Sequence, residues 1–369
     1  MPSVGLVCDP DFPKQVAEQL VEALPQKVNE QLEDQREWSF QVVCDPVAAG
    51  RNSGEEILQA AGSQKSQYEW DYVLCLTDLP LRSEGAPVLA GIGVDKGVAA
   101  LSLPALGGTQ PYRRAQQMVV QALDEMIGAT EQSEQRSYTQ RRRGLHSRLT
   151  ELLAPIRRET PNRDEIGVRY RATRHRGHLR LLSGMVRGNT PWRLVFGMSS
   201  ALAAAVATSA FGLSSSTIWQ ISHQLNPARQ ALAAVASVAV LVIWLIAAHH
   251  LWERPNQSHD RELRMLYNTS TVLTLTIGVT CLYVGLLVIN LGLASFLVPS
   301  SLLTSQLSSP VTFGSYVSLA WGFTTMGVVA GALGSSLESD QAVRQAAYGY
   351  RESQRRARYQ EDGNENPSS

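Results

Sequence analysis

Three aspartates stand directly after three short apolar runs near the start of the chain, and a proline follows each within two residues. Asp9 comes after SVGLVC, Asp45 after FQVVC and Asp78 after YVLCLT. If these runs are parallel strands, the three carboxylates gather beyond the carboxyl ends of the strands, where open α/β sheets bind ligands. Clustered carboxylates at that edge would hold a divalent cation, a sugar or a ribose. The alternative is that each aspartate caps a turn or a helix start as the chain leaves its strand.

Other patterns that carry chemistry are incomplete. The sequence has no GxxxxGK[ST], HExxH or GxSxG motif, and no GxGxxG motif follows its first apolar run. His175 and His178 lie among arginines, without acidic or cysteine partners at metal spacing, which indicates a basic surface. Cys8, Cys44 and Cys75 fall in the apolar runs without CxxC spacing, so we expect free, buried thiols in a reducing compartment. The sequence therefore predicts no metal site and leaves catalytic residues and cofactor unspecified.

Alternating strand and helix patterns in residues 1–130 supply the elements that position the aspartates. Strands are predicted at Ser3–Cys8, Phe40–Cys44, Tyr72–Thr77, Pro87–Gly93 and Val98–Leu103. Helical patterns lie between them at about 12–32 and 54–62, and a further one follows at about 111–128. The order predicts an α/β domain with a parallel sheet, an added hairpin and helices on both faces.

A long stretch almost without charge begins further along the chain. Between Leu194 and Leu337 there are only seven charged residues: Arg229, and six in the run from Glu253 to Arg264. A membrane-spanning helix needs about 20 predominantly apolar residues. Four segments satisfy this, at about 194–213, 231–252, 271–297 and 311–334. We therefore expect an all-α four-helix transmembrane domain at 191–340, followed by a tail at 341–369.

The arginines near the ends of these segments predict an orientation. Thirteen lie before the first segment, between the second and third, or after the fourth, whereas the two opposite loops hold only Arg229. Positive residues are enriched on the cytoplasmic side of membrane proteins. With no predicted cleavable signal peptide, this pattern favours a multi-pass protein of the plasma membrane with both termini in the cytoplasm.

The segment 131–190 joins the two predicted domains and is rich in arginine. From Arg136 to Arg193 there are fifteen arginines and no lysine. Such a segment beside a membrane is attracted to anionic lipid headgroups at about 1 kcal/mol per residue. The pattern at 140–156 also fits an amphipathic helix lying on the bilayer. Nucleic-acid binding is an alternative explanation of the arginine content, but few aromatic residues lie among the arginines. We therefore expect a lipid partner and no nucleic-acid partner. The residues predicted to contact the membrane surface are Arg141, Arg142, Arg143, Arg174, Arg176 and Arg180.

Within the predicted membrane domain, small and polar residues indicate helix packing. Gly327, Gly331 and Gly334 lie on one helical face where another helix can approach closely, either in the same chain or in a second copy. These glycines are the predicted contact of a homo-oligomer. Asn290 and Tyr283 are placed to hydrogen-bond between helices. No ionisable residue lies at mid-membrane depth, which weakens a transport function.

Two resemblances to known families can be traced in particular residues. The segments 70–78 (WDYVLCLTD) and 97–103 (GVAALSL) are similar in layout to the N-terminal part of archaemetzincin-like metalloproteases, whose zinc-binding HExxH helix is missing here. The segments GMVR at 184–187, PWR at 191–193 and LWER at 251–254 resemble a group of uncharacterised actinobacterial four-span membrane proteins with an N-terminal cytosolic α/β domain. This second resemblance covers nearly the whole chain and implies the fold without an activity. Some of its members carry a methylenetetrahydrofolate dehydrogenase label, for which this chain has no dinucleotide-binding fingerprint.

Three functional hypotheses follow from the sequence. The first is a membrane-anchored cytosolic sensing or scaffold module. The second is a membrane-tethered enzyme that uses Asp9, Asp45 and Asp78 at the carboxyl edge of the sheet. The third is a small transporter or channel subunit built from the membrane helices.

Overall fold

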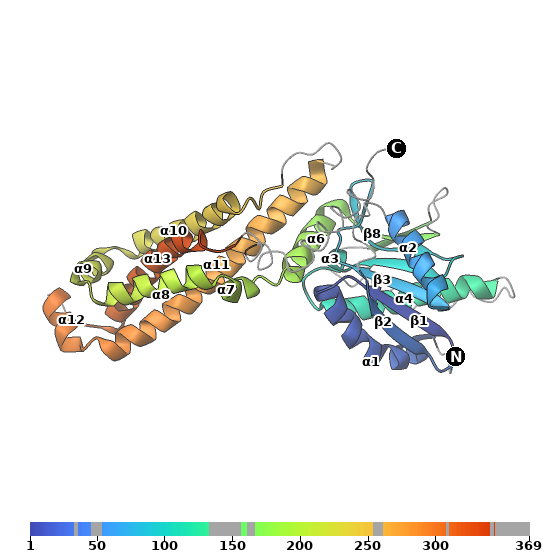
Figure 1. Ribbon diagram of the computed structural model, residues 1–369, viewed down its shortest axis with the longest axis horizontal. Coiled ribbons are helices and arrows are strands. Elements are labelled where there is room, and N and C mark those ends of the chain that lie inside the picture. The colour runs from blue at the N-terminus through green and yellow to red at the C-terminus, as the bar shows by residue number, and fades with distance from the viewer. Residues whose placement is uncertain are drawn as a thin grey trace. The chain divides into compact units, whose positions relative to one another are not determined.

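The structure is a computed structural model that describes residues 1–32, 36–45, 54–132, 156–160, 167–253, 261–307, 310–339 and 343. The described residues form two compact units, one within Met1–Asn189 and the other within Thr190–Gly349 (Figure 1). The first unit is a mixed α/β domain and the second is helical.

A single sheet of eight described strands forms the centre of the first unit, in the order β2-β1-β3-β6-β5-β8-β7 with β4 paired to β5 (Figure 1). The strands are β1 (Ser3–Cys8), β2 (Ser39–Cys44), β3 (Tyr72–Thr77), β4 (Arg82–Ser83), β5 (Ala86–Gly93), β6 (Val98–Ser102), β7 (Ile156–Glu159) and β8 (Val168–Ala172). Neighbours among β2, β1, β3 and β6 run parallel, while β5, β8 and β7 add antiparallel pairs. The predicted α/β sheet with its hairpin is confirmed.

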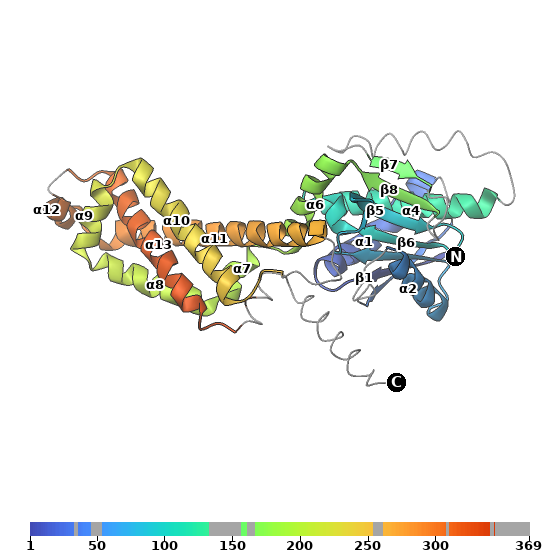
Figure 2. The same cartoon turned by 90° about the horizontal axis from the view of Figure 1, so that it is seen from above.

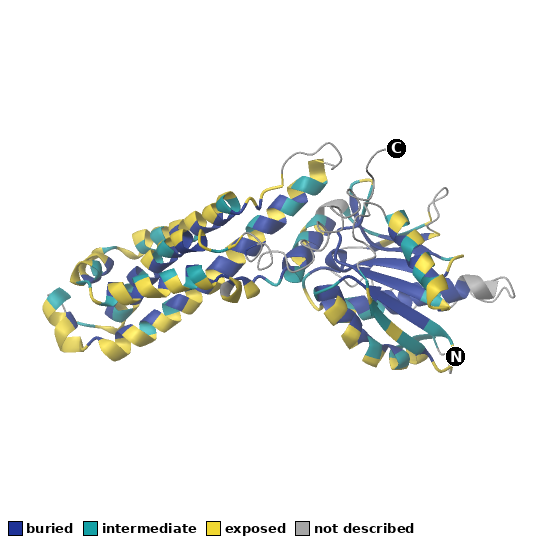
Figure 3. Cartoon of the chain, in the orientation of Figure 1, coloured by how far each residue is buried: buried dark blue, intermediate teal, exposed yellow. Residues whose placement is uncertain are grey.

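Helices cover both faces of this sheet, as predicted. Helix α2 (Gly54–Gln67) packs on β3 and β6, and its Ile57 joins Val73 and Val98 in one buried cluster. Helix α1 (Phe12–Leu32) and helix α4 (Pro111–Gln132) pack against each other and against the strands. The central strands are buried along almost their whole length, which explains why they read as continuous apolar runs (Figure 3).

The first unit extends well beyond residue 130, where the sequence predicted its end. Strands β7 and β8, and helix α6 (Arg174–Gly188), come from the arginine-rich segment that was expected to be a separate juxtamembrane region. In β8 the residues Val168, Tyr170 and Ala172 are buried and alternate with two arginines. This alternation with period two identifies a strand, and the arginine content obscured it. The predicted amphipathic helix at 140–156 lies outside the described residues except for Ile156, which begins β7.

The second unit contains the apolar helices. They are α7 (Arg193–Gly197), α8 (Ser199–Leu213), α9 (Ser216–Gln224), α10 (Pro227–Ala248), α11 (Arg261–Leu297), α12 (Ser300–Leu307) and α13 (Phe313–Ser335). Among the described residues, α10, α11 and α13 are each long and apolar enough to cross a membrane, and α8 with α9 forms a fourth candidate bent by 91°. Three to four spans therefore mark this unit as the membrane-embedded part. The predicted uniform helix at 194–213 is replaced by α7 and α8, separated at Met198.

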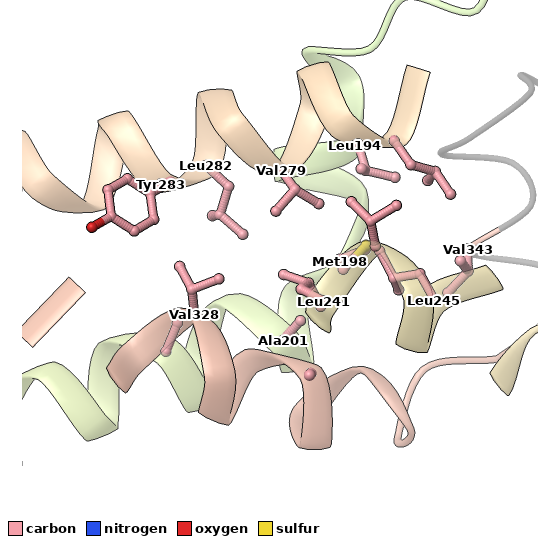
Figure 4. Packing of buried hydrophobic residues seen from close by; sticks show 14 of the residues in the cluster. Leu194, Met198, Ala201, Leu241, Leu245, Val279, Leu282, Tyr283, Val328 and Val343 are labelled. Carbon is pink, nitrogen blue, oxygen red and sulfur yellow. The ribbon is translucent and has the colours of Figure 1, made fainter. Parts of the chain in front are cut away.

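The interior of the membrane unit is formed by apolar side chains from several helices. Leu194, Leu241, Leu245, Val279 and Val328 belong to one buried cluster (Figure 4). Helices α8 and α10 each run beside α13, and α9 lies next to α12 (Figure 2). Many large apolar side chains on the outer faces of these helices are exposed, as expected for surfaces that contact lipid.

The glycine face of α13 is used within the chain. A Cβ atom on Gly327 would lie 2.8 Å from the carbonyl oxygen of Ala205, and one on Gly334 would lie 2.6 Å from Cβ of Ala204. Both contacts are on α8, and Gly331 also faces this helix at the carbonyl of Ala201. Small residues allow helix backbones to approach this closely in membranes. In this chain α8 therefore packs on the face formed by Gly327, Gly331 and Gly334, and the association of two copies stays a prediction.

Polar side chains connect the same helices. The Nδ2 of Asn290 donates to Oγ of Ser209 at 3.1 Å and to Oγ1 of Thr324 at 3.0 Å. The Tyr283 hydroxyl and Oγ1 of Thr325 are 2.9 Å apart. The predicted hydrogen bonds of Asn290 and Tyr283 between helices are therefore present, and they act as packing contacts.

Candidate ligand site at the carboxyl edge of the sheet

The parallel strands end together at one edge of the sheet. In the strand register Cys8 pairs with both Cys44 and Leu76, and Thr77 pairs with Ser102. Residues that follow these strand ends are therefore held at one edge by the hydrogen-bonded ladder. This is the edge at which open α/β sheets bind ligands.

Asp9 is buried at the end of β1, with 4% of its surface exposed. Its Oδ2 accepts a hydrogen bond of 2.7 Å from the Thr77 hydroxyl, at the end of β3. The backbone N–H of Leu79 donates to the same Thr77 oxygen at 3.0 Å. The carboxylate of Asp9 is thus tied to the neighbouring strand.

Asp78 follows Thr77 directly and is also buried, with 5% of its surface exposed. The turn after it is fixed to the next strand, because the Ser102 hydroxyl donates to the Leu79 carbonyl at 2.6 Å. The fold thus places the Asp9 carboxylate against Thr77 and places Asp78 one residue later in the chain. Buried carboxylates at adjacent strand ends offer hydrogen-bond acceptors to a ligand.

Asp45 does not share this burial. It follows the edge strand β2, is only half-buried, and its Oδ2 accepts a hydrogen bond from Nε2 of Gln64 on α2. Over the described ranges, no group of three or more His, Cys, Asp or Glu side chains is placed to hold a metal ion. The three-carboxylate cation site that the sequence offered as one interpretation is therefore not formed by the described residues.

The loop after β6 brings two arginines to the same region of the fold. Strand β6 is followed by the short helix α3 (Leu103–Leu106), by Gly107 and Gly108, and then by α4. Nε of Arg180 donates to the Ala105 carbonyl at 2.8 Å, and Nη1 of Arg114 donates to the Leu106 carbonyl at 2.7 Å. Helix α6 carries Arg180 to this loop.

Arg180 was predicted to contact the membrane surface, and the structure corrects this. Only 8% of its surface is exposed, because α6 packs closely on α3 at Gly184, where a Cβ atom would collide with the Pro104 carbonyl. Arg176, on the same helix, is exposed and remains a predicted lipid contact. Arg174 lies in α6 with its side chain outside the described set, and Arg141, Arg142 and Arg143 lie outside the described residues.

The arginine site escaped the sequence prediction for two reasons. Arg114 and Arg180 lie far apart in the chain, and only the packing of α6 on α3 brings them together. A signal did exist in Gly107 and Gly108, which stand between a strand and a helix, as in loops that bind phosphate groups. The spacing of these two glycines does not match the standard phosphate-binding motifs, so the sequence alone did not predict an anion site at this loop.

The thiol of Cys8, at the end of β1, is not a reactive nucleophile. Cys8 and Cys75 are buried as predicted, but Cys44 on the edge strand is exposed, contrary to the prediction. Burial, and then the neighbouring Cys44, raise the pKa of Cys8 to about 12. At neutral pH Cys8 is therefore a protonated thiol, and its Sγ donates to the Val43 carbonyl at 3.6 Å.

Comparison with known proteins gave no match: no family model, no curated protein and no solved structure is detectably similar to this chain. The resemblance to actinobacterial four-span proteins therefore remains a prediction, and the function has to be argued from the site.

Proposed function

We propose that this is a multi-pass plasma membrane protein whose cytosolic α/β unit is a sensing module for a small ligand. The ligand binds at the carboxyl edge of β1, β3 and β6. The observation that carries the proposal is the burial of two carboxylates, Asp9 and Asp78, at the ends of adjacent parallel strands. Buried carboxylates cost free energy, and they are concentrated at functional sites for that reason.

The chemistry of this edge suits a ligand that carries hydroxyl groups. A carboxylate accepts hydrogen bonds at both of its oxygens, and one oxygen of Asp9 already accepts from Thr77. Sugar or ribose hydroxyls would donate to the carboxylates of Asp9 and Asp78. The strand ladder and the Ser102 to Leu79 hydrogen bond fix the backbone around these two residues, so the acceptors are held before the ligand arrives.

The test is a ligand screen on the full chain in lipid nanodiscs. Sugars, nucleosides and nucleotides are added one at a time, and unfolding of the α/β unit is followed by hydrogen exchange. A ligand should slow exchange at the ends of β1 and β3, and this effect should be lost in Asp9→Asn and Asp78→Asn. Asp95→Asn, in the exposed turn between β5 and β6, is the matched control and should behave like the wild type.

Two results of the screen separate the hypotheses. If no ligand protects the strand ends, or if protection is unchanged in both aspartate variants, the proposed site is wrong. Mass spectrometry of the ligand after incubation distinguishes a sensor from an enzyme, because a sensor returns the ligand unaltered.

The orientation of the membrane unit is the second part of the proposal. Both termini lie in the cytoplasm, and the support is the excess of arginine at one set of helix ends. Ser305, exposed on α12, lies between the last two predicted spans and should be extracellular. In Ser305→Cys, a membrane-impermeant maleimide should label position 305 in intact cells, whereas the exposed native Cys44 should react only after lysis. Labelling of Cys44 in intact cells, with position 305 labelled only after lysis, would show the opposite orientation.

A further inference from the structure

We propose that the α/β unit binds the phosphate group of a phosphorylated small molecule between Arg114 and Arg180, at the loop that joins β6 to α4. This inference deepens the proposed function, on which it rests for the remainder of the ligand. It uses different residues, however, and can therefore fail independently.

The first observation is that the two arginine side chains converge on one place. A Cβ atom on Gly107 would lie 2.8 Å from Cγ of Arg180 and 2.9 Å from Nη1 of Arg114. Both side chains therefore occupy the space that a larger residue at position 107 would fill. They also donate to the carbonyls of two consecutive residues, Ala105 and Leu106. Two positive groups thus lie side by side at the end of α3.

The second observation is that no acidic side chain among the described residues compensates this positive charge. Arg180 is more than nine-tenths buried, and neither Nη1 nor Nη2 has a hydrogen-bond partner among the described residues. In the same described part of the chain, no acidic side chain pairs with Arg180 or Arg114. Burial and the neighbouring Arg114 together lower the pKa of Arg180 to about 10, so the side chain is still charged at neutral pH. A buried and unpaired arginine is costly, and an anion would compensate it.

The third observation is the backbone around the pair. Gly107 has a φ of +90°, a conformation that favours glycine, and the Gly108 N–H donates to the Ser183 hydroxyl at 3.2 Å. The 22-residue helix α4 begins three residues later, at Pro111. The first N–H groups of a helix lack acceptors within the helix, and its N-terminus carries a partial positive charge. Arg114 extends from this first turn, so the helix end and both arginines favour the same anion.

These features favour a phosphate group over a carboxylate. A phosphate monoester carries close to two negative charges, which match two guanidinium groups, and its oxygens accept hydrogen bonds from more than one donor fork. The hydroxyl-binding carboxylates of the proposed site follow β1 and β3, and β3 is the neighbour of β6 in the sheet. The ligand class is therefore a sugar phosphate or a nucleotide, with its phosphate at Arg114 and Arg180 and its hydroxyls at Asp9 and Asp78.

Arg114 provides the approach from solvent. It is half-buried, whereas the terminal nitrogens of Arg180 are enclosed, so binding requires a small shift of the Arg180 side chain. The hydrogen bond from its Nε to Ala105 can persist while the terminal nitrogens turn toward the anion.

The experiment uses the full chain in phosphatidylcholine nanodiscs and inorganic phosphate as the probe. Isothermal titration gives the affinity at constant ionic strength, and the thermal midpoint gives the stability without phosphate. Arg180→Met should weaken phosphate binding by about tenfold or more while leaving the phosphate-free protein as stable as the wild type, or more stable. A purely structural role for Arg180 would instead lower the thermal midpoint. Arg176→Met, exposed on the same helix, is the matched control and should keep both values.

A second variant protects the test against a folding defect. Arg114→Gln sits at the half-buried side of the pair and should also weaken phosphate binding, with native hydrogen exchange in the central strands. If the wild type does not bind phosphate at millimolar concentration, or if Arg180→Met and Arg114→Gln bind it as well as the wild type, the inference is overturned. Asp9→Asn should still bind inorganic phosphate. Retained nucleoside or sugar binding at Asp9 without phosphate binding would preserve the proposed function and remove only this inference.

The phosphate can come from a soluble metabolite or from a lipid headgroup. Addition of glycerol 3-phosphate to phosphatidylcholine nanodiscs tests the soluble source, and nanodiscs with phosphatidic acid and no soluble phosphate test the lipid source. Protection of the 107–114 loop from hydrogen exchange in either arm supports the phosphate site and identifies the source. Absence of protection in both arms contradicts it.

Discussion

Glu125 on α4 holds the two added strands of the sheet to the rest of the unit, and its removal should be strongly destabilising. Its side chain is 6% exposed and accepts hydrogen bonds from Nε and Nη2 of Arg158 at 2.8 and 2.9 Å. It also accepts a bond of 2.8 Å from the hydroxyl of Tyr170, which is fully buried in β8. Glu125→Ala would therefore remove the carboxylate that pairs with a cation on β7 and the acceptor of a buried hydroxyl on β8, which would keep its hydrogen bond with Gln121.

The expected cost can be assembled from these two losses. Removing one partner of a buried ion pair costs about 3–5 kcal/mol, and the lower end applies because the Arg158 side chain is 25% exposed. The buried hydroxyl of Tyr170, which loses its acceptor, adds about 1–3 kcal/mol. These terms overlap, since Arg158 can turn toward water, so the expected loss is about 3–5 kcal/mol. Glu125→Gln retains an acceptor for both donors and should lose about 1–2 kcal/mol.

Hydrogen exchange of the full chain in nanodiscs measures this loss locally, as the opening free energy of the β8 amides. A whole-protein melting curve would detect a loss of stability but would not locate it in β8, because two units of different kind need not unfold together. Glu84→Ala is the control: Glu84 also pairs with a β8 arginine, Arg171, but its side chain is 81% exposed. That variant should lose less than about 1 kcal/mol. A loss below about 1 kcal/mol in Glu125→Ala would refute the assignment of this network as the anchor of β7 and β8.

Three further predictions follow from the same structure. Burial, and then Glu125, raise the pKa of Tyr170 above its ordinary value of 10.0. The stability that the protonated hydroxyl contributes is therefore present below pH 10 and is lost as the pH rises further. Thermal midpoints measured between pH 8 and pH 11 should fall less in Tyr170→Phe than in the wild type. Gly327→Leu should lower the stability of the membrane unit by about 1–3 kcal/mol, because the larger side chain forces α13 away from α8. Gly292→Leu should not lower it, because position 292 has open space around it. The two variants are compared by their resistance to unfolding in denaturing detergent. Maleimide at pH 8 should modify the exposed Cys44 and leave Cys8 unmodified until the chain is unfolded, as peptide mass spectrometry would show.

The part of the fold that was predictable is the part in which local pattern and burial agree. Strands β1 and β3 are apolar throughout because both of their faces are covered, and α1 has the bounds that its sequence pattern predicted. Strand β8 was missed because Arg169 and Arg171 alternate with its buried residues, so that composition indicated a membrane surface while spacing indicated a strand. The first membrane segment was predicted as one helix, because apolar composition sets total length and does not locate breaks such as the one at Met198.

The candidate site likewise contains residues that the sequence predicted and residues that it did not. Asp9 and Asp78 were predictable because a strand end is a local feature, and parallel order places such ends at one edge. The fate of each arginine was not predictable, because the sequence shows a charge but not its burial or its partner. In the structure Arg158 and Arg171 have carboxylate partners, and Arg176 is exposed to solvent. Arg180 has neither, since the close approach of α6 to α3 buries it beside a second arginine. Because the strand arginines Arg158 and Arg171 are paired with carboxylates, the lack of one at Arg180 among the described residues points to an anion from outside them.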